Sequence, residues 1–160
     1  MDELLQRTTG LPEITLAVGD VLVREGEAGE GLWILVSGTL NISKAGTAIT
    51  SISRPGAAIG EISLLLNSPY TATVVAGAPS ILRHAADGRA LLASDPAITR
   101  LIAAGLAERL DFATTYLVDL KHQYGDSPGL AMVSEVLDQL AHRQGPAARP
   151  GSEREPNPDY

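Results

Sequence analysis

The chain has 160 residues, of which 44% are hydrophobic, and a formal net charge of −7. This length and apolar content suit one compact domain with tails and argue against a disordered chain. The acidic balance argues against a nucleic-acid partner, because basic side chains drive binding to phosphate backbones.

Several classes of protein are excluded by what the chain lacks. Without cysteine it has no disulfide, thiolate metal site or cysteine nucleophile. Its three histidines, His84, His122 and His142, have no metal-ligand spacing, and no nucleophile–base pair is recognisable, so we expect no metal, no cofactor and no enzyme. No apolar run approaches the roughly 20 residues of a membrane span, and the N-terminus has no apolar signal core, so we expect a cytoplasmic protein without membrane contact.

The first half of the chain is typical of a β-protein. Residues 1–10 are expected to form an N-terminal helix, and the region from Leu11 to His84 then alternates short apolar runs with Gly and Pro. Strands are expected at 20–25, 32–38, 39–43, 48–53, 72–77 and 80–85, with turns rich in glycine between them. Many short strands at even spacing indicate a sandwich or barrel rather than a parallel sheet.

The second half has helical spacing. Asp95 as N-cap and Pro96 as first helical residue predict the start of a helix that runs to about residue 124. Its apolar stripe either packs only on the strands or serves both the strands and a partner helix, and the second interpretation is slightly favoured. The stripe comprises Ile98, Leu101, Ile102, Leu106, Leu110, Ala113, Leu117 and Leu120.

A further helix is predicted over 125–144, starting at Ser127-Pro128 and stopped by Gly145. The segment 145–160 is rich in Pro and charge and is expected to be a disordered tail. About forty residues thus follow the long helix, which is too few for a DNA-binding winged helix, so we expect a stand-alone module.

The stretch "GEISLLLNSPYTATV", residues 60–74, has the rhythm of a phosphate-binding loop. Gly60 permits close backbone approach, and the apolar run after Glu61 predicts one turn of helix. The first turn of a helix presents unpaired N–H groups that can bind an anion. Glu61 offers an acceptor for a sugar hydroxyl, although its alternative role is that of a solvated acid on a turn.

Two ordered groups of residues resemble the cyclic-nucleotide-binding domain, the family of the bacterial catabolite activator protein and the regulatory subunits of cAMP-dependent kinase. The resemblance covers about Leu11 to Lys121, and the ordered pair of motifs is specific. The upstream group comprises Leu22, Val23, Gly26, Glu27, Gly29, Leu32 to Leu35, and Gly38. The downstream group, the phosphate-binding cassette, comprises Gly60, Glu61, Leu64, Pro69, Ala72, Thr73 and Val74.

The resemblance implies an α+β fold: a Gly-rich eight-stranded β-roll, jelly-roll-like, with flanking helices and a long C-terminal helix. It implies that Glu61 bonds a ribose hydroxyl, and that Thr114 and Thr115 on the long helix contact the purine. It also implies that backbone groups contact a cyclic phosphate of cAMP or cGMP. Those groups belong to Gly60, Glu61, Ile62, Ser63, Thr71 and Ala72, with the hydroxyl of Thr71 joining them.

The cassette departs from the family pattern at its centre, where Tyr70 stands in place of the family's arginine. A charged hydrogen bond to phosphate is worth roughly 1.5–3 kcal/mol, so its loss lowers affinity by about tenfold to a hundredfold. Tyr70 fills and closes the phosphate site, stacks on a base or sugar, or packs in the core. Arg24, Arg54 and Arg83 are candidates to supply the missing charge from other strands.

Two functions therefore remain open from the sequence. The first is a regulatory protein that senses cAMP or a related nucleotide and signals through helix movement to a partner or a homodimer interface. The second is a degenerate domain that no longer binds cyclic nucleotide and acts as a ligand-independent interaction or dimerisation module. The sequence narrowly favours the first. Trp33 is expected to pack in the core or at its rim in either case.

Overall fold

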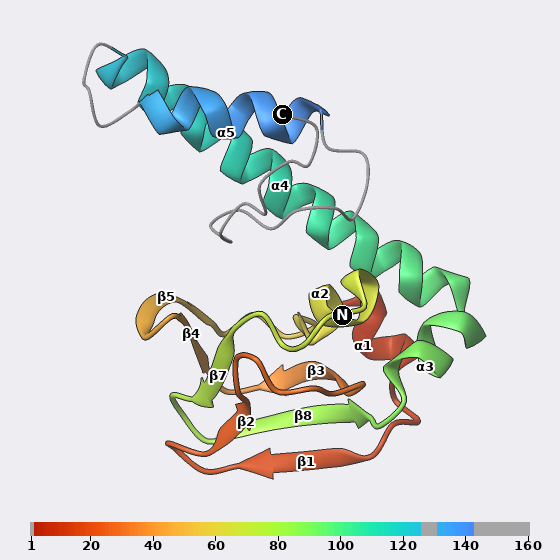
Figure 1. Ribbon diagram of the computed structural model, residues 1–160. Coiled ribbons are helices and arrows are strands. Elements are labelled where there is room, and N and C mark those ends of the chain that lie inside the picture. Colours follow the sequence, from red (N-terminus) through yellow and green to blue (C-terminus); the bar gives the residue numbers. More distant parts are fainter. Residues whose placement is uncertain (1, 126–130, 143–160) are drawn as a thin grey trace. The chain divides into compact units, whose positions relative to one another are not determined.

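The computed structural model describes residues 2–125 and 131–142. It divides into two units, residues 1–108 and residues 109–160. The first unit holds eight strands, the helices α1 to α3 and the start of α4, and it contains the candidate site (Figure 1).

Eight antiparallel strands form the β-roll, in two four-stranded sheets. One sheet has the order β1-β8-β3-β6, with β1 at Glu13–Leu16, β8 at Ser80–Ala85, β3 at Leu32–Ser37 and β6 at Ala58–Ile59. The other has the order β2-β7-β4-β5, with β2 at Val21–Val23, β7 at Thr73–Ala76, β4 at Leu40–Lys44 and β5 at Thr47–Ile52. The predicted fold class is confirmed.

Alternation along β3 separates two hydrophobic clusters, because successive side chains of a strand point to opposite faces. Trp33 and Leu35 face the interior of the roll, where they pack with Leu40, Leu82 and Tyr70. Leu32 and Ile34 face the helices on the other side. This second cluster attaches α1, α2 and the base of α4 to the roll, since it contains Leu4, Leu64, Ala85, Ile98 and Ile102.

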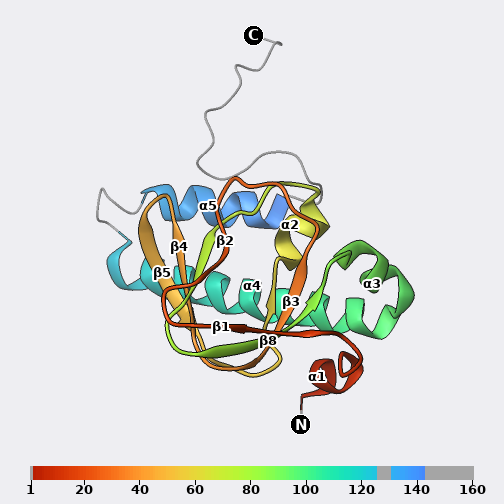
Figure 2. The same cartoon turned by 90° about the horizontal axis from the view of Figure 1, so that it is seen from below.

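The helices follow the capping signals closely. Asp2 caps α1 (Glu3–Arg7) by accepting a hydrogen bond from the Leu4 amide. Asp87 caps α3 (Gly88–Ser94) through the Ala90 amide at 2.9 Å. The long helix α4 spans Pro96–Tyr124, and α5 spans Ala131–His142. The cassette helix α2 (Glu61–Leu66) lies beside α3 at one end of the roll (Figure 2).

The sequence expectations missed three elements. No strand was predicted over β1 or β6, which are short, and no separate helix was predicted over α3, ahead of the start of the long helix at Pro96. The predicted start of the last helix at Ser127 and its stop at Gly145 lie outside the described residues, as does the predicted tail. Within the described part of the chain, no single helix is long and apolar enough to cross a membrane; α3 and α4 meet the length and composition only together, with a 109° bend between them.

Candidate ligand-binding site

The cassette is built on the short helix α2 and the glycine that precedes it. Gly60 has φ 93°, in the left-handed region, and a Cβ there would lie 2.6 Å from the carbonyl oxygen of Gly31. Only glycine fits this position, because any side chain would meet both backbone strain and a backbone atom. The helix ends at Asn67, also left-handed with φ 51°, and the Ser68 amide then donates to the Ser63 carbonyl at 3.0 Å.

The polar residues of α2 that were predicted to bind the ligand are buried. Glu61 is 5% exposed and Ser63 is 3% exposed, while Ile62 is half-buried. The alternative role of Glu61 as a solvated acid is therefore wrong. Glu61 itself takes part in a polar interaction, so its side chain is held in place inside the fold. A fixed acceptor of this kind is what recognition of a hydroxyl requires.

Tyr70 lies in the interior of the roll. Its side chain is 8% exposed and belongs to the interior cluster, with its ring centroid 6.0 Å from that of Trp33. A Cβ placed on Gly29 would lie 2.1 Å from the phenol oxygen, so the ring covers Gly29 directly. Two backbone hydrogen bonds hold this contact: the Tyr70 amide donates to the Glu27 carbonyl at 2.9 Å, and the Gly26 amide donates to the Tyr70 carbonyl at 2.8 Å.

The phenol of Tyr70 contributes no charge. Burial raises the pKa of Tyr70, while a hydrogen bond from the backbone of Gly31 lowers it and the nearby Glu27 carboxylate raises it. Desolvation is the largest of these causes, because a phenolate is poorly solvated inside the roll. The residue at the centre of the cassette is therefore a neutral group that already receives a hydrogen bond from the backbone.

Trp33 packs against the backbone of Gly31 and Gly60 at the cassette. A Cβ on Gly31 would lie 2.4 Å from its indole, and a Cβ on Gly60 would lie 3.4 Å from it. On its other side the indole stacks on His84, with ring centroids 5.0 Å apart and 5° between the planes. The expected core position of Trp33 is confirmed, and aromatic rings occupy the interior below the loop that carries Gly29.

The three arginines considered as substitutes for the missing cation each pair with an acidic residue. Arg24 lies 3.9 Å from Glu27 and Arg54 lies 3.9 Å from Asp2, both as exposed pairs. Arg83 pairs with Glu13 at 3.4 Å and donates to the Leu5 carbonyl at the end of α1. None of these contacts reaches the cassette helix or residues 69–73.

Arg89 on α3 is a residue near the cassette that the sequence did not indicate. Its guanidinium donates to the Asn67 side chain at 2.7 Å and lies 3.9 Å from Glu30, so it joins the end of α2 to the loop that carries Gly29. Because these partners are 22 and 59 positions away in sequence, no local pattern could have revealed them. Arg89 faces the outer side of this arrangement, with its side chain 47% exposed.

The remaining predicted contacts are placed as follows. Thr71 and Ala72 are half-buried and directly follow Tyr70 in the chain, and their contact with a phosphate stays a prediction. Thr114 is half-buried and Thr115 is exposed, and both lie on the part of α4 that belongs to the second unit. The assignment of these two threonines to a purine stays a prediction.

In the described part of the chain, a metal centre is absent and a surface groove lies apart from the cassette. No group of three His, Asp or Glu side chains is arranged to hold a metal ion there. An open groove of about 510 Å³ lies against α3, and it is lined largely by apolar side chains with His84 at its inner edge. None of its lining residues belongs to the cassette.

Comparisons with known proteins agree with this geometry. Residues 13–87, which include all eight strands and α2, match the model of the family described as "Cyclic nucleotide-binding domain". The chain is 38% identical over 64 residues to the cAMP-dependent protein kinase regulatory subunit of Yarrowia lipolytica, covering 40% of this chain and 17% of that protein.

A second curated relative extends along the helices. The chain is 29% identical over 144 residues to the CRP-like cAMP-activated global transcriptional regulator of Mycobacterium tuberculosis, covering 86% of this chain and 62% of that protein. The chain spans less than two thirds of the length of either relative. Among solved structures, Thermus thermophilus Catabolite Activator Protein has the same fold, with a TM-score of 0.58 at 24% identity over 88% of this chain and 84% of that one.

Proposed function

Residues 13–87 belong to the cyclic nucleotide-binding domain family, and from this premise we propose that the chain is a regulatory module in which Tyr70 closes the cassette to cyclic nucleotides. Its output is an interaction made by the helices. A non-catalytic role is part of the proposal, since the two curated relatives described above are named as regulators. The observation that carries the proposal is the buried position of Tyr70 over Gly29.

The physical argument concerns the charge of a cyclic phosphate. A phosphate taken out of water needs a cation or several donors, and an uncompensated buried charge is strongly unfavourable. Tyr70 is neutral and fills the space above Gly29. Arg54 and Arg83 pair with acidic residues outside the cassette, and the charge of Arg24 is offset by Glu27. A cyclic nucleotide would have to displace the ring from the core and then bind without its usual counter-charge.

A second candidate, the sensing of cAMP, cGMP or a related nucleotide, is favoured by the parts of the site that persist. Gly60 keeps the left-handed conformation that precedes α2, and the buried Glu61 stands at the position to which the family resemblance assigns the ribose hydroxyl. In this candidate the ligand moves Tyr70 aside and so repositions α2. The required coupling is a difference in ligand affinity between the two positions of the ring.

Calorimetry with cAMP and with cGMP separates the two candidates. We expect no binding heat from the natural chain at high micromolar nucleotide, and we expect Tyr70→Arg to gain affinity by about tenfold to a hundredfold through the restored ionic hydrogen bond. Tyr70→Ala is the matched control, because it opens the same space without adding charge and should gain far less.

Tight binding of cAMP or cGMP by the natural chain would contradict the closed-cassette proposal and would support the second candidate, a nucleotide sensor. A thermal-shift screen of cyclic mononucleotides and dinucleotides extends the test to other ligands. A ligand at 100 times its dissociation constant adds about 2.7 kcal/mol to the free energy of unfolding.

The interaction in this proposal is a homodimer formed through α5 and the part of α4 that follows residue 108. On α4 the side chains of Leu110 and Phe112 are 51% and 74% exposed, and on α5 that of Met132 is 72% exposed. None of the side chains described between 109 and 140 is buried. Helices of this kind gain most of their stability by packing an apolar face, so a second copy of the same helices is the occupant we propose.

A further inference from the structure

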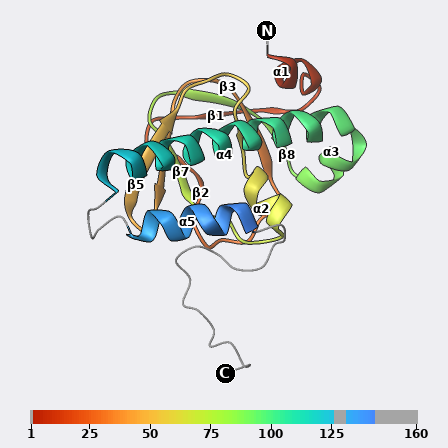
Figure 3. The ribbon, with the colours of Figure 1, turned by 90° about the horizontal axis from the view of Figure 1, so that it is seen from above.

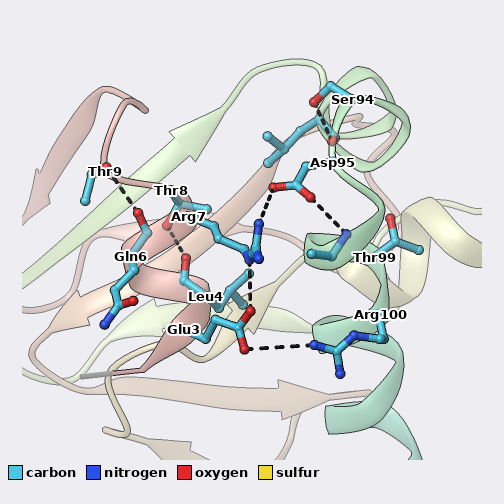
Figure 4. A network of polar contacts seen from close by, with 12 residues as sticks. Glu3, Leu4, Gln6, Arg7, Thr8, Thr9, Ser94, Asp95, Thr99 and Arg100 are labelled. Atoms are coloured by element: carbon cyan, nitrogen blue, oxygen red, sulfur yellow. Dashed lines mark hydrogen bonds and ion pairs between the residues drawn. The ribbon is translucent and has the colours of Figure 1, made fainter.

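A network of four charged side chains joins α1 to the corner between α3 and α4, and we call these four residues the α1 clasp (Figure 4). Arg7 at the centre lies 3.0 Å from Glu3 and 3.2 Å from Asp95. Glu3 also lies 3.9 Å from Arg100, on the second turn of α4. The clasp therefore reaches both the corner and the body of the long helix, and α1 lies beside both (Figure 3).

Asp95 is the residue at which the two helices meet. Its amide donates to the Leu91 carbonyl at the end of α3, and its Oδ1 accepts from the Ala97 amide at 2.9 Å in the first turn of α4. Its second oxygen, Oδ2, accepts from Arg7. One carboxylate thus caps α4 and binds α1 at the same time, so the direction of α4 at this corner is tied to the position of α1.

The helix α1 is fixed on the roll independently of the clasp. Leu4 is 6% exposed in the helix-facing cluster, and Thr8 is 1% exposed with its hydroxyl donating to the Leu4 carbonyl at 2.7 Å. Arg83 on β8 donates to the Leu5 carbonyl. The first turns of α4 are attached to the same cluster through the buried Ile98 and Ile102. Loss of the clasp would therefore loosen the corner at Asp95, while both helices stay packed on the roll.

The charged side chains of the clasp are partly exposed to solvent. Hydrogen bonds to Glu3 and Asp95 raise the pKa of Arg7. The hydrogen bond from the Ala97 amide, followed by that from Arg7, lowers the pKa of Asp95. The side chains of Arg7 and Asp95 are 38% and 32% exposed, so the clasp stays charged at neutral pH yet is open to salt and to competing ions.

We propose that the α1 clasp is a charge-dependent switch that sets the α3–α4 corner from the N-terminal side, without participation of the cassette. Closed, it holds the first turns of α4 against α1. It opens when Arg7 and Arg100 are neutralised by competing anions or when the network is screened. The inference rests on the proposed function in one respect, namely that α4 makes the interaction with the partner. The clasp would then regulate this interaction in a module whose cassette is closed to nucleotides.

Hydrogen exchange of the full-length protein, followed by mass spectrometry, tests the switch. The peptide to follow covers residues 92–104, and the variants are Arg7→Gln and Asp95→Asn. Asparagine keeps the cap of α4 and removes only the charge. We expect exchange in this peptide to become about threefold faster in each variant at low ionic strength. The double variant should add little to either single one, because both remove the same contact.

Two controls make the result specific. Arg54→Gln removes another exposed contact of the N-terminal region, with Asp2, and should leave exchange at 92–104 unchanged. Raising NaCl to about 0.5 M should accelerate the natural protein toward the rate of Arg7→Gln and change that variant less, because only the contact between Glu3 and Arg100 remains in it. Unchanged exchange in Arg7→Gln and Asp95→Asn, or an equal effect of Arg54→Gln, would overturn the switch.

The outcome is independent of nucleotide binding. The measurement needs no ligand, so a finding that the natural chain binds cAMP would overturn the closed cassette and leave the clasp standing. Repeating the exchange on Tyr70→Arg with and without cAMP shows whether the cassette acts through the same corner. An effect of Arg7→Gln that disappears when the nucleotide is bound would contradict the independence of the two inputs.

Discussion

At position 70 the identity of one side chain changes what the site can do. The sequence showed that Tyr70 replaces an arginine, but it left three positions for the ring open. Only the packing shows that the ring lies in the interior over Gly29, since this depends on the course of residues 26–31 and on Trp33. The motif around Glu61 favoured a position in the pocket over a solvated turn, and the fold around α2 buries the residue.

The buried phenol predicts a dependence of stability on pH. Since the pKa of Tyr70 is raised in the folded state, its contribution is complete below the pKa of about 10 of an unfolded tyrosine and is lost as the pH rises toward the folded value. Urea unfolding between about pH 9 and pH 11 should therefore show a steeper loss of stability in the natural chain than in Tyr70→Phe. At pH 7 the variant should be less stable by about 1–2 kcal/mol, because the backbone of Gly31 loses its partner. Parallel curves for the two proteins would contradict the burial of the ring.

Among the elements, α3 occupies the position between the cassette and α4. Its first residue packs on α2, Arg89 joins it to Asn67, and Asp95 ends it at the clasp. The start of α4 at Pro96 was predicted because Asp-Pro is a strong local signal. By contrast, β1, β6 and α3 were missed because each is short and is stabilised by partners remote in sequence, as in the pairing of β1 with β8.

The close approach of α3 to α2 predicts opposite effects for two alanine substitutions. A Cβ on Gly88 would lie 2.4 Å from Leu64 and 2.9 Å from the Glu30 carbonyl, so Gly88→Ala should lower the free energy of unfolding by about 1–3 kcal/mol. Gly105 on α4 has nothing within 4 Å of the same position, so Gly105→Ala should raise it by about 0.5–1 kcal/mol. Chemical denaturation measures both. A gain from Gly88→Ala would show that α3 does not pack on α2 in this way.

On the scale of the whole molecule, the two units differ in how they obtain stability. The first has two hydrophobic clusters around its strands, and its roll was predictable from strand spacing together with the ordered motifs. The apolar stripe of α4 proved to be divided: Ile98 and Ile102 are buried in the first unit, whereas Leu110 is 51% exposed in the second. The sequence shows one continuous stripe because spacing alone does not indicate where the core ends.

The exposed part of that stripe predicts self-association. Light scattering after gel filtration should give twice the chain mass of 16.7 kDa. Leu110→Glu should raise the dissociation constant at least about tenfold, because it places a charge in the proposed interface. His122→Glu, an exposed change three to four turns along the same helix and off the stripe, should leave the mass unchanged. A monomer at all concentrations would contradict the homodimer and leave a different protein as the partner.

The position of Trp33 beside the cassette has a consequence for optical spectroscopy. Trp33 is the only tryptophan of the chain, and its ring lies 6.0 Å from Tyr70 and stacks on His84. Light absorbed by the Tyr70 phenol is therefore transferred efficiently to an indole that is itself shielded from water. Any event that turns Tyr70 out of the roll must shift or dim the emission of this single fluorophore, so the unlabelled protein reports whether its own cassette is open or closed.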